Sequence, residues 1–185
     1  MVKKNSISKQ DNYSKLIKLA LAVINNTYTD AELHNYKQFS IKSPICLAIK
    51  RQGKIIAYDG ILDTKIPIYE KVLYTARIAG IESNKIHKEE GKELSVEIAL
   101  LSKPKLLKVT KPEQYLKKIV IGKDGLLLPK QEITAVLMPY YGIMHPQTTL
   151  LHYIEELCKR AELEKNEWKD LTNKIYIFSI KKIIK

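Results

Sequence analysis

Hydrophobic residues recur at helical spacing in two stretches of the N-terminal half. The first stretch, residues 11–26, predicts an amphipathic helix with one buried face. Its apolar positions are Leu16, Ile17, Leu19, Ala20, Val23 and Ile24. The second stretch, residues 65–80, has Pro67 near its start and Gly80 at its end, and predicts a second helix bounded by these two residues. Its apolar positions are Ile68, Val72, Leu73, Ala76 and Ala79.

Two runs rich in β-branched and apolar residues lie between these helices. Residues 43–50 and 54–62 are separated by a short loop that contains Gly53. Because glycine adopts positive φ without steric cost, this loop suits a tight turn. The pattern predicts a β-hairpin.

Asp59 lies well inside the second of these strands. Alternation along the strand places four residues on one face: Ile55, Ala57, Asp59 and Ile61. The other face carries Ile56, Tyr58, Gly60 and Leu62. A carboxylate among such apolar neighbours indicates either the rim of a pocket or a bulge that ends the regular strand at Gly60.

The C-terminal half mixes short strands with few helices. Strands are predicted over residues 94–102, 119–122, 126–129, 132–138 and 174–180. A turn at Asp124-Gly125 joins the second and third of these in a second predicted hairpin. A short helix is predicted over residues 111–118 and a longer one over residues 145–163, with Pro146 in its first turn. Since strands and helices do not alternate regularly, the sequence predicts an α+β fold with a mainly antiparallel sheet flanked by helices.

The composition is that of a globular protein. The chain has 185 residues, 45% of them apolar and 28% charged, enough for one compact domain or for two small lobes that share a core. No apolar run approaches the roughly 18 residues of a transmembrane helix, and the N-terminal stretch lacks a cleavage pattern, so we expect a cytoplasmic protein. Cys46 and Cys158 form neither a Cys-x-x-Cys pair nor a zinc-like spacing, and we expect no metal and no cofactor.

The formal charge of +12 raises the hypothesis of nucleic-acid binding, because clustered cations displace counterions from phosphate. Only three of the 32 basic residues are arginines, namely Arg51, Arg77 and Arg160. Lysines act as point charges rather than as forked readers of phosphate or guanine, and here they are spread from Lys3 to Lys185. The charge pattern therefore favours a solvated lysine surface.

Sequence motifs for nucleotide binding and serine hydrolysis are missing. Residues 122–125 (GKDG) contain two glycines, but they lie between two predicted strands and not at a strand-to-helix turn, so they form neither a P-loop nor a dinucleotide fingerprint. No G-x-S-x-G motif occurs. His145 and His152 are seven residues apart, whereas helical ligand pairs are three or four apart, so these two would bind a metal only with ligands from elsewhere.

Several short sequence words occur together in a specific order and spacing. They are LIKLALAVI, GKIIAYDGIL, LSVEIALLSKPKLL, IVIGKDGLLL, AVLMP and LHYIEELCKRAEL, followed by Trp168 and IYIFSI. Over about residues 11–178 the chain resembles the AMMECR domain family, whose microbial members are component A of the AmmeMemoRadiSam system. The resemblance implies a larger lobe with an antiparallel sheet and a smaller lobe, intimately packed within a single domain of residues 1–185, with a cleft between them.

The resemblance also locates a candidate site on the strand that contains Asp59. Where the hallmark of that family reads Leu-Arg-Gly-Cys-Ile-Gly, residues 55–60 read Ile-Ile-Ala-Tyr-Asp-Gly, so the Arg and the Cys are replaced and Gly60 is kept. The family's Asp-x-Arg-Phe segment is replaced by residues 82–93. A tyrosine, with a pKa of about 10, is a poor substitute for a thiol nucleophile, so Tyr58 cannot replace the family's cysteine in that role.

Together these observations predict a protein of the AMMECR type, whose biochemical activity the resemblance does not establish, that binds a small ligand or a protein partner in the inter-lobe cleft. The candidate ligand-binding residues are Ile56, Tyr58, Asp59 and Gly60. Two alternatives stay open, namely an enzyme that uses Asp59 as general acid or base and a sequence-neutral nucleic-acid binder with a lysine-rich surface. The resemblance implies Memo-like and radical S-adenosylmethionine proteins as partners. The sequence predicts neither catalytic residues nor an oligomeric state.

Overall fold

The chain folds into two compact units. The structure, a computed structural model, describes four stretches: residues 9–29, 34–86, 94–130 and 133–185. Unit 1 comprises Met1–Leu100 together with Lys182–Lys185, and unit 2 comprises Leu101–Lys181.

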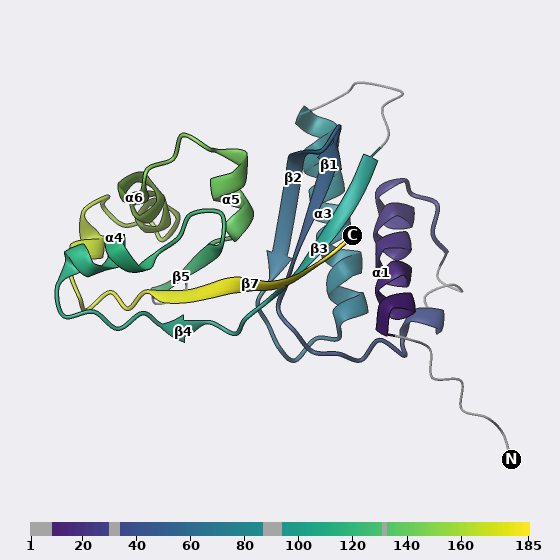
Figure 1. The fold of residues 1–185 in the computed structure, drawn as a ribbon, viewed down its shortest axis with the longest axis horizontal. Helices are drawn as coiled ribbons and strands as arrows, with labels where there is room; N and C mark the ends of the chain where they lie inside the picture. The colour runs from purple at the N-terminus through teal and green to yellow at the C-terminus, as the bar shows by residue number, and fades with distance from the viewer. Residues whose placement is uncertain (1–8, 30–33, 87–93, 131–132) are drawn as a thin grey trace, which may run out of the picture. The chain divides into compact units, whose positions relative to one another are not determined.

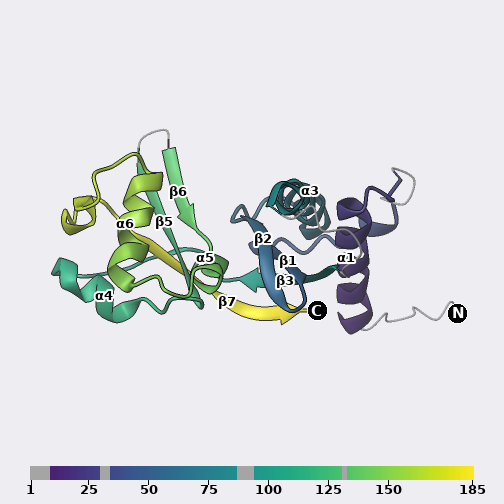
Figure 2. The same ribbon diagram turned by 90° about the horizontal axis from the view of Figure 1, so that it is seen from above.

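Unit 1 is built from two long helices and an antiparallel sheet (Figure 1). Its elements are α1 (Lys9–Ile24), η1 (His34–Tyr36), β1 (Ile45–Arg51), β2 (Lys54–Ile61), α3 (Ile68–Ile86) and β3 (Leu94–Leu101). The strand order is β2-β1-β3, and the last residues of β7 (Tyr176–Ile184) follow β3. Helix α3 packs on β1 and β2, and α1 packs on α3 (Figure 2). Because β2 ends the strand order, it is an edge strand.

The predicted apolar faces of unit 1 meet in one hydrophobic core. Its members include Leu16, Leu19, Ala20 and Val23 from α1, and Ile68, Val72, Ala76 and Ala79 from α3. The sheet contributes Ile45, Leu47, Ile49, Val96 and Ile98. The amphipathic helices and the first hairpin are therefore confirmed. In the hairpin turn Gln52 has φ 50° and Gly53 has φ 77°, the positive values that a type I′ turn requires.

The second helix does not end where the sequence predicted. Instead of stopping at Gly80, α3 runs through this residue to Ile86. A Cβ built on Gly80 would lie 3.6 Å from the Ile24 side chain, so the small residue lies where α1 and α3 approach one another. Gly80 therefore lies inside the helix and does not mark its end. Residues 87–93 lie outside the described stretches.

Unit 2 contains a second group of antiparallel strands flanked by shorter helices. Its elements are β4 (Lys105–Leu106), η2 (Pro112–Gln114), α4 (Tyr115–Lys118), β5 (Asp124–Lys130), β6 (Ile133–Leu137), α5 (Pro139–Met144), α6 (Leu150–Arg160), η3 (Glu167–Lys169) and the first part of β7. Strand β5 pairs with β6 and β7, and β4 pairs with β7. Helix α6 packs on β5 and β6 (Figure 2).

The predicted second hairpin is wrong in its position. Residues 119–122 form no strand, and the supposed turn residues Asp124 and Gly125 begin β5, which pairs with β6. The turn comes earlier, because Gly122 adopts φ 80° and the Asp124 carboxylate accepts a hydrogen bond from the Val120 N–H at 2.9 Å. In the sequence, an aspartate whose side chain caps the preceding turn cannot be distinguished from an aspartate that itself forms an Asp-Gly turn.

The single long helix predicted over residues 145–163 is also wrong in its extent. The structure has α5 before His145, which the sequence did not predict, and α6 begins only at Leu150. Thr149 is the N-cap of α6, since its hydroxyl accepts a hydrogen bond from the His152 N–H at 3.2 Å. Pro146 lies in the connection between the two helices.

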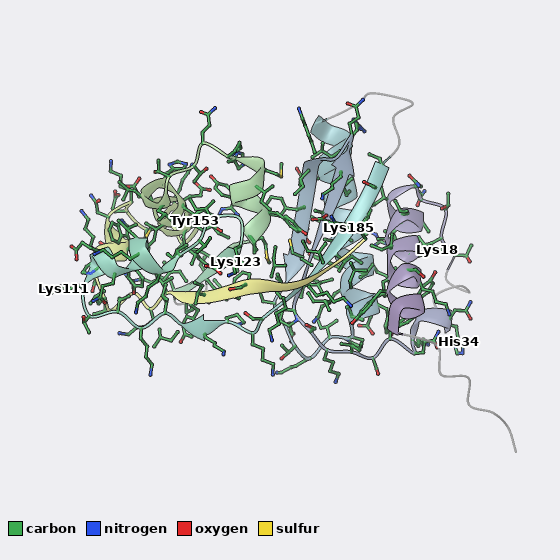
Figure 3. All side chains as sticks on the ribbon, in the orientation of Figure 1. Lys18, His34, Lys111, Lys123, Tyr153 and Lys185 are labelled. Carbon is green, nitrogen blue, oxygen red and sulfur yellow. The ribbon has the colours of Figure 1, made fainter. Side chains whose placement is uncertain are left out.

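The fold class is confirmed as α+β, with antiparallel strands flanked by helices in each unit. The single domain of two packed lobes and the cleft between them stay predictions. None of the helices in the described stretches is both long and apolar enough to cross a membrane. Exposed lysines occur in both units, as shown by Lys18 and Lys185 in unit 1 and by Lys111 and Lys123 in unit 2 (Figure 3).

Candidate functional site

Asp59 lies on the edge strand β2 and faces the helical side of the unit 1 sheet. Its cross-strand partner is Leu47, and the neighbouring pair is Ala57 with Ile49. Directly opposite residues of an antiparallel pair point to the same face, and Leu47, Ile49 and Ala57 all belong to the hydrophobic core. The carboxylate therefore lies at the border of an apolar layer, as strand alternation predicted.

The Asp59 carboxylate is incompletely hydrogen-bonded. Its Oδ2 atom is buried and has no hydrogen-bond partner in the described chain. Burial raises the pKa of this carboxyl above its usual value, and the Gly60 backbone N–H opposes the rise only in part. The group is therefore a half-buried acid, one oxygen of which lacks a donor within the described chain.

Tyr58 and Gly60 lie on the opposite face of the same strand. Tyr58 pairs with Ala48 and Gly60 pairs with Cys46 on β1. Ala48 in turn pairs with Glu97 on β3, so this face also carries an acidic side chain. Strand alternation thus separates Tyr58 from Asp59, and only a ligand that reaches the edge of β2 can contact both.

Ile56 belongs to the core of unit 1. The β1–β2 register shifts between Ile49 and Lys50, so that Ile56 is left without a directly opposite residue. Its side chain is 8% exposed and packs within the hydrophobic cluster. Of the four predicted site residues, Ile56 is the one most enclosed by core side chains.

The buried Glu97 and the partly buried Lys50 accompany Tyr58 on its face of the sheet. Lys50 Nζ forms an ion pair with the Glu97 carboxylate. The pKa of the buried Cys46 thiol is raised well above its usual value. Burial is the main cause, and the negative charges of Asp59 and Glu97 add to it. A thiol held protonated in this way is a poor nucleophile, so Cys46 does not replace the cysteine that Tyr58 displaces.

Lys71 is a buried charged residue that sequence reasoning missed. Its side chain is fully buried in α3, and Nζ donates a hydrogen bond to the Ser43 carbonyl at 2.7 Å. Burial lowers the pKa of this amine, and the Asp63 carboxylate partly opposes the change. Helical spacing could have found it, because Lys71 lies three residues after the buried Ile68 and four before the buried Thr75.

Unit 2 contains a buried carboxylate, Asp124, both oxygens of which accept a hydrogen bond. One oxygen accepts from the Ser179 hydroxyl at 2.5 Å and the other from the Val120 N–H. The Asp124 carbonyl also accepts from the Tyr153 hydroxyl at 2.9 Å. Asp124 therefore joins a turn, strand β7 and helix α6, which is a structural role.

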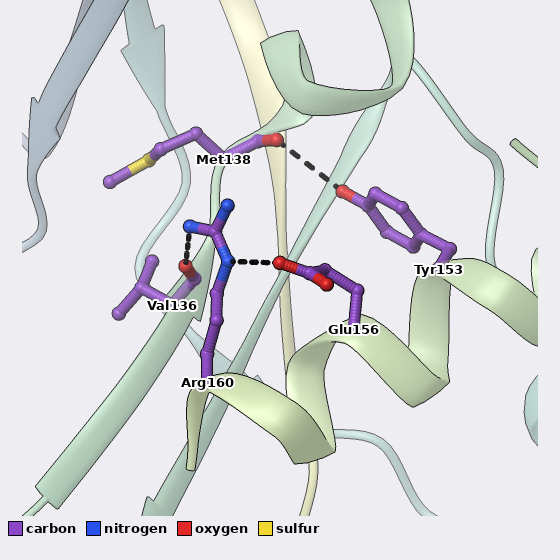
Figure 4. A network of polar contacts seen from close by, with 5 residues as sticks. All are labelled: Val136, Met138, Tyr153, Glu156 and Arg160. Atoms are coloured by element: carbon purple, nitrogen blue, oxygen red, sulfur yellow. Dashed lines mark hydrogen bonds and ion pairs between the residues drawn. The ribbon is translucent and has the colours of Figure 1, made fainter. Parts of the chain in front are cut away.

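The neighbouring polar contacts in unit 2 attach α6 to β6 (Figure 4). Arg160 donates to the Glu156 carboxylate at 3.1 Å and to the Val136 carbonyl at 3.2 Å. The Tyr153 hydroxyl is 3.4 Å from the Met138 carbonyl oxygen. These hydrogen bonds fix α6 against the strand, and we assign no acid–base role to the residues that make them.

The two histidines that the sequence singled out line one open hollow of about 420 Å³ between α5 and α6. His145 also packs against the Tyr141 ring, with 4.6 Å between the ring centroids. In the described stretches no group of three or more His, Cys, Asp or Glu side chains is placed to hold a metal ion.

Comparison with known proteins identifies the family. The family model for AMMECR1 matches residues 17–183, nearly the whole chain. The chain belongs to the AMMECR1 family. This agrees with the resemblance carried by the sequence words, while residues 55–60 depart from the family's hallmark.

Relatives of this AMMECR1 chain occur in bacteria and archaea. A protein of Aquifex aeolicus is 33% identical over 116 residues, which cover 61% of this chain and 58% of the relative. A protein of Methanococcus aeolicus is 27% identical over 123 residues, which cover 65% of this chain and 60% of the relative. The chain thus spans about three fifths of the length of these curated relatives.

A solved structure shares the AMMECR1 fold. The crystal structure of an uncharacterized protein from Pyrococcus horikoshii superposes with a TM-score of 0.72 at 21% sequence identity, covering 95% of this chain and 91% of that one. At this identity the likeness supports the fold alone.

Proposed function

We propose that this AMMECR1-family chain is a binding protein that receives a ligand or a protein partner at the edge of β2, around Tyr58, Asp59 and Gly60. The observation that carries the proposal is the buried Oδ2 atom of Asp59, which has no hydrogen-bond partner in the described chain. Leaving a buried acceptor unsatisfied costs roughly 1–3 kcal/mol, and more when the group is charged. A bound donor would recover this energy.

The position of the strand suits an approach from outside the sheet. Strand β2 is hydrogen-bonded to β1 and ends the strand order, so one side of its backbone is not used for pairing within the sheet. A partner at this edge reaches Asp59 from one face of the strand and Tyr58 from the other. Gly60 between Asp59 and Ile61 allows close approach of a second backbone or ligand.

The Asp59 carboxylate favours a ligand that carries a hydrogen-bond donor. A carboxylate with an unpaired oxygen is best satisfied by an ammonium or a guanidinium, which supplies both N–H donors and opposite charge. We infer a ligand with such a group or a partner that presents Lys or Arg. Memo-like and radical S-adenosylmethionine proteins, which the family resemblance associates with AMMECR proteins, are the first partners to test.

The test uses the full chain labelled with ¹⁵N and methylguanidinium as the probe. We expect saturable shifts of the Asp59 and Gly60 amide signals, which Asp59→Asn abolishes because it removes the charge at nearly constant volume. The control is Asp170→Asn, the same change at an exposed carboxylate of unit 2. Equal shifts in wild type and Asp59→Asn would contradict the proposal, and unchanged spectra away from the site show that the variant is folded.

Acid–base catalysis by Asp59 is a second candidate function, favoured by the raised pKa of its carboxyl. A general acid needs to keep its proton closer to neutral pH than an ordinary aspartate does. A ¹³C titration of the Asp59 carboxyl measures this directly. A midpoint at or below the ordinary value of 3.8 would remove this candidate.

A further inference from the structure

A separate pocket of about 220 Å³ lies within unit 2, and its described lining includes no residue of β2. One wall is the extended segment that includes Leu107 and Val109, just after β4. Tyr115 of α4 and the segment with Leu171 and Lys174, which leads into β7, complete the lining. Two stretches distant in sequence, residues 106–115 and 171–174, therefore line one hollow.

Backbone-directed hydrogen bonds hold these walls together. The Leu107 N–H donates to the Ile175 carbonyl at 2.9 Å, which continues the pairing of β4 with β7. The Lys118 ammonium donates to the Lys108 carbonyl at 2.7 Å and ties α4 to the extended segment. The pocket is thus shaped by fixed backbone rather than by loose surface side chains.

The lining of the pocket is apolar around a single phenol. Its apolar members are Leu106, Leu107, Val109 and Leu171. Tyr115 is only 2% exposed, and burial raises the pKa of its hydroxyl. No hydrogen bond joins this hydroxyl to the part of the chain that the structure describes, so a bound ligand can accept one from it.

Two ammonium groups flank the apolar surface. Lys108 and Lys174 line the pocket and are exposed, and none of its described lining residues is acidic. Asp170 interacts electrostatically with Lys174, while both Asp170 oxygens accept hydrogen bonds from Thr172, through its N–H at 2.9 Å and its hydroxyl at 2.8 Å. Lys174 Nζ donates to the Leu171 carbonyl at 2.8 Å, which leaves further donors on this ammonium. The pocket therefore combines apolar walls, a free phenol and excess positive charge.

We propose that this pocket binds a small monocarboxylate with an aryl or branched alkyl body. The body lies against the leucine and valine side chains, and the carboxylate lies between Lys108, Lys174 and the Tyr115 hydroxyl. A dry cavity of roughly 150 Å³ accommodates benzene. About 220 Å³ is therefore suited to one ring with a short carboxylate arm.

The experiment titrates the full ¹⁵N-labelled chain with 3-phenylpropionate and, in parallel, with the neutral 3-phenylpropanamide. We expect saturable shifts of amides in residues 106–109 and 171–174, with a Kd on the order of 1 mM for a ligand of this size. The carboxylate should bind roughly tenfold more tightly than the amide, because only the carboxylate pairs with the two ammonium groups. Tyr115→Phe, which removes only the hydroxyl, should weaken carboxylate binding by a few fold.

The matched variants remove two charges each. Lys108→Gln/Lys174→Gln should lose about tenfold in affinity for the carboxylate and keep its affinity for the amide. Lys159→Gln/Lys165→Gln, at exposed positions of the same unit, should leave both affinities unchanged. Absence of saturable shifts in wild type, equal binding of carboxylate and amide, or an equal loss in the control pair overturns the proposal. Because the comparison of the two ligands uses wild type, it decides the matter even where a variant is unstable.

Discussion

At the scale of single residues, Asp59 should make the stability of unit 1 depend on pH. Its pKa in the folded chain lies above the ordinary value, so between the two pKa values the folded chain holds a proton that the unfolded chain has released. Stability then falls as the pH rises through the folded pKa. Urea unfolding of wild type and Asp59→Asn at pH 4.5 and pH 7.5 measures the effect.

In that experiment Asp59→Asn should raise the free energy of unfolding at pH 7.5 by about 1 kcal/mol, because it removes a partly buried charge with one unpaired oxygen. At pH 4.5 the gain should shrink, since the aspartate then retains more of its proton. A variant that is less stable than wild type at pH 7.5 would show that the charged carboxylate is satisfied after all.

Part of the candidate site could be predicted from the sequence. Alternation along β2 was sufficient to separate Asp59 from Tyr58 and to place Asp59 among apolar side chains. Helical spacing could have indicated the burial of Lys71, because it lies on the same helix face as buried residues. The unpaired oxygen of Asp59 could not be predicted, because it depends on which donors the fold brings near the carboxylate. A local sequence pattern does not show which residues from distant parts of the chain come close together in the fold.

At the scale of secondary-structure elements, two glycines should respond in opposite ways to alanine. Gly80→Ala should stabilise unit 1 by about 0.5–1 kcal/mol, since it lies inside α3 and the added Cβ meets Ile24 at 3.6 Å, an ordinary contact distance. Gly125→Ala should destabilise unit 2 by about 2 kcal/mol or more, because its Cβ would lie 2.4 Å from the Phe178 ring. Thermal unfolding of the two variants tests both signs.

The boundaries of α6 show which local signals were decisive. The sequence contained the correct one, because Thr149 directly precedes the apolar helical stretch and threonine is a preferred N-cap. Pro146, which also suits a first turn, was the competing signal and gave the wrong start. The β5 boundary offered no such choice, since the Asp124 carboxylate accepts from the nearby Val120 N–H and also from the Ser179 hydroxyl, which is distant in sequence.

At the scale of the whole molecule, the two cysteines report on the two units separately. Cys46 is buried in unit 1, and Cys158 is buried in unit 2. Burial is the main cause that raises the pKa of Cys158 to about 11, so at pH 8 both thiols should react with DTNB only after local or global unfolding.

Single-cysteine variants make this a test of cooperativity. We expect Cys46→Ala and Cys158→Ala chains to label at the same denaturant concentration, because a single domain of two packed lobes unfolds as one. Labelling at two different concentrations would mean that units 1 and 2 are independent domains.

The lysine-rich surface should give only weak, sequence-neutral attraction to nucleic acid. Exposed lysines occur on elements of both units, and the chain carries a formal charge of +12 (Figure 3). Any binding to a 20-base-pair duplex at 50 mM salt should therefore be equal for unrelated sequences and disappear by about 200 mM. Fluorescence anisotropy measures it, and sequence-selective binding that survives at 200 mM would instead favour a dedicated nucleic-acid site.

The division of strand β7 between the two units affects the order in which they can fold during synthesis. Its residue Phe178 packs in unit 2, whereas Ile184 is 4% exposed and belongs to the core of unit 1. A nascent chain that has been synthesised as far as β3 still lacks Ile184, a member of the unit 1 core. This residue is added only after the whole of unit 2 has been translated. During synthesis, unit 2 therefore emerges as one contiguous segment, whereas the core of unit 1 is complete only after Ile184 has been translated.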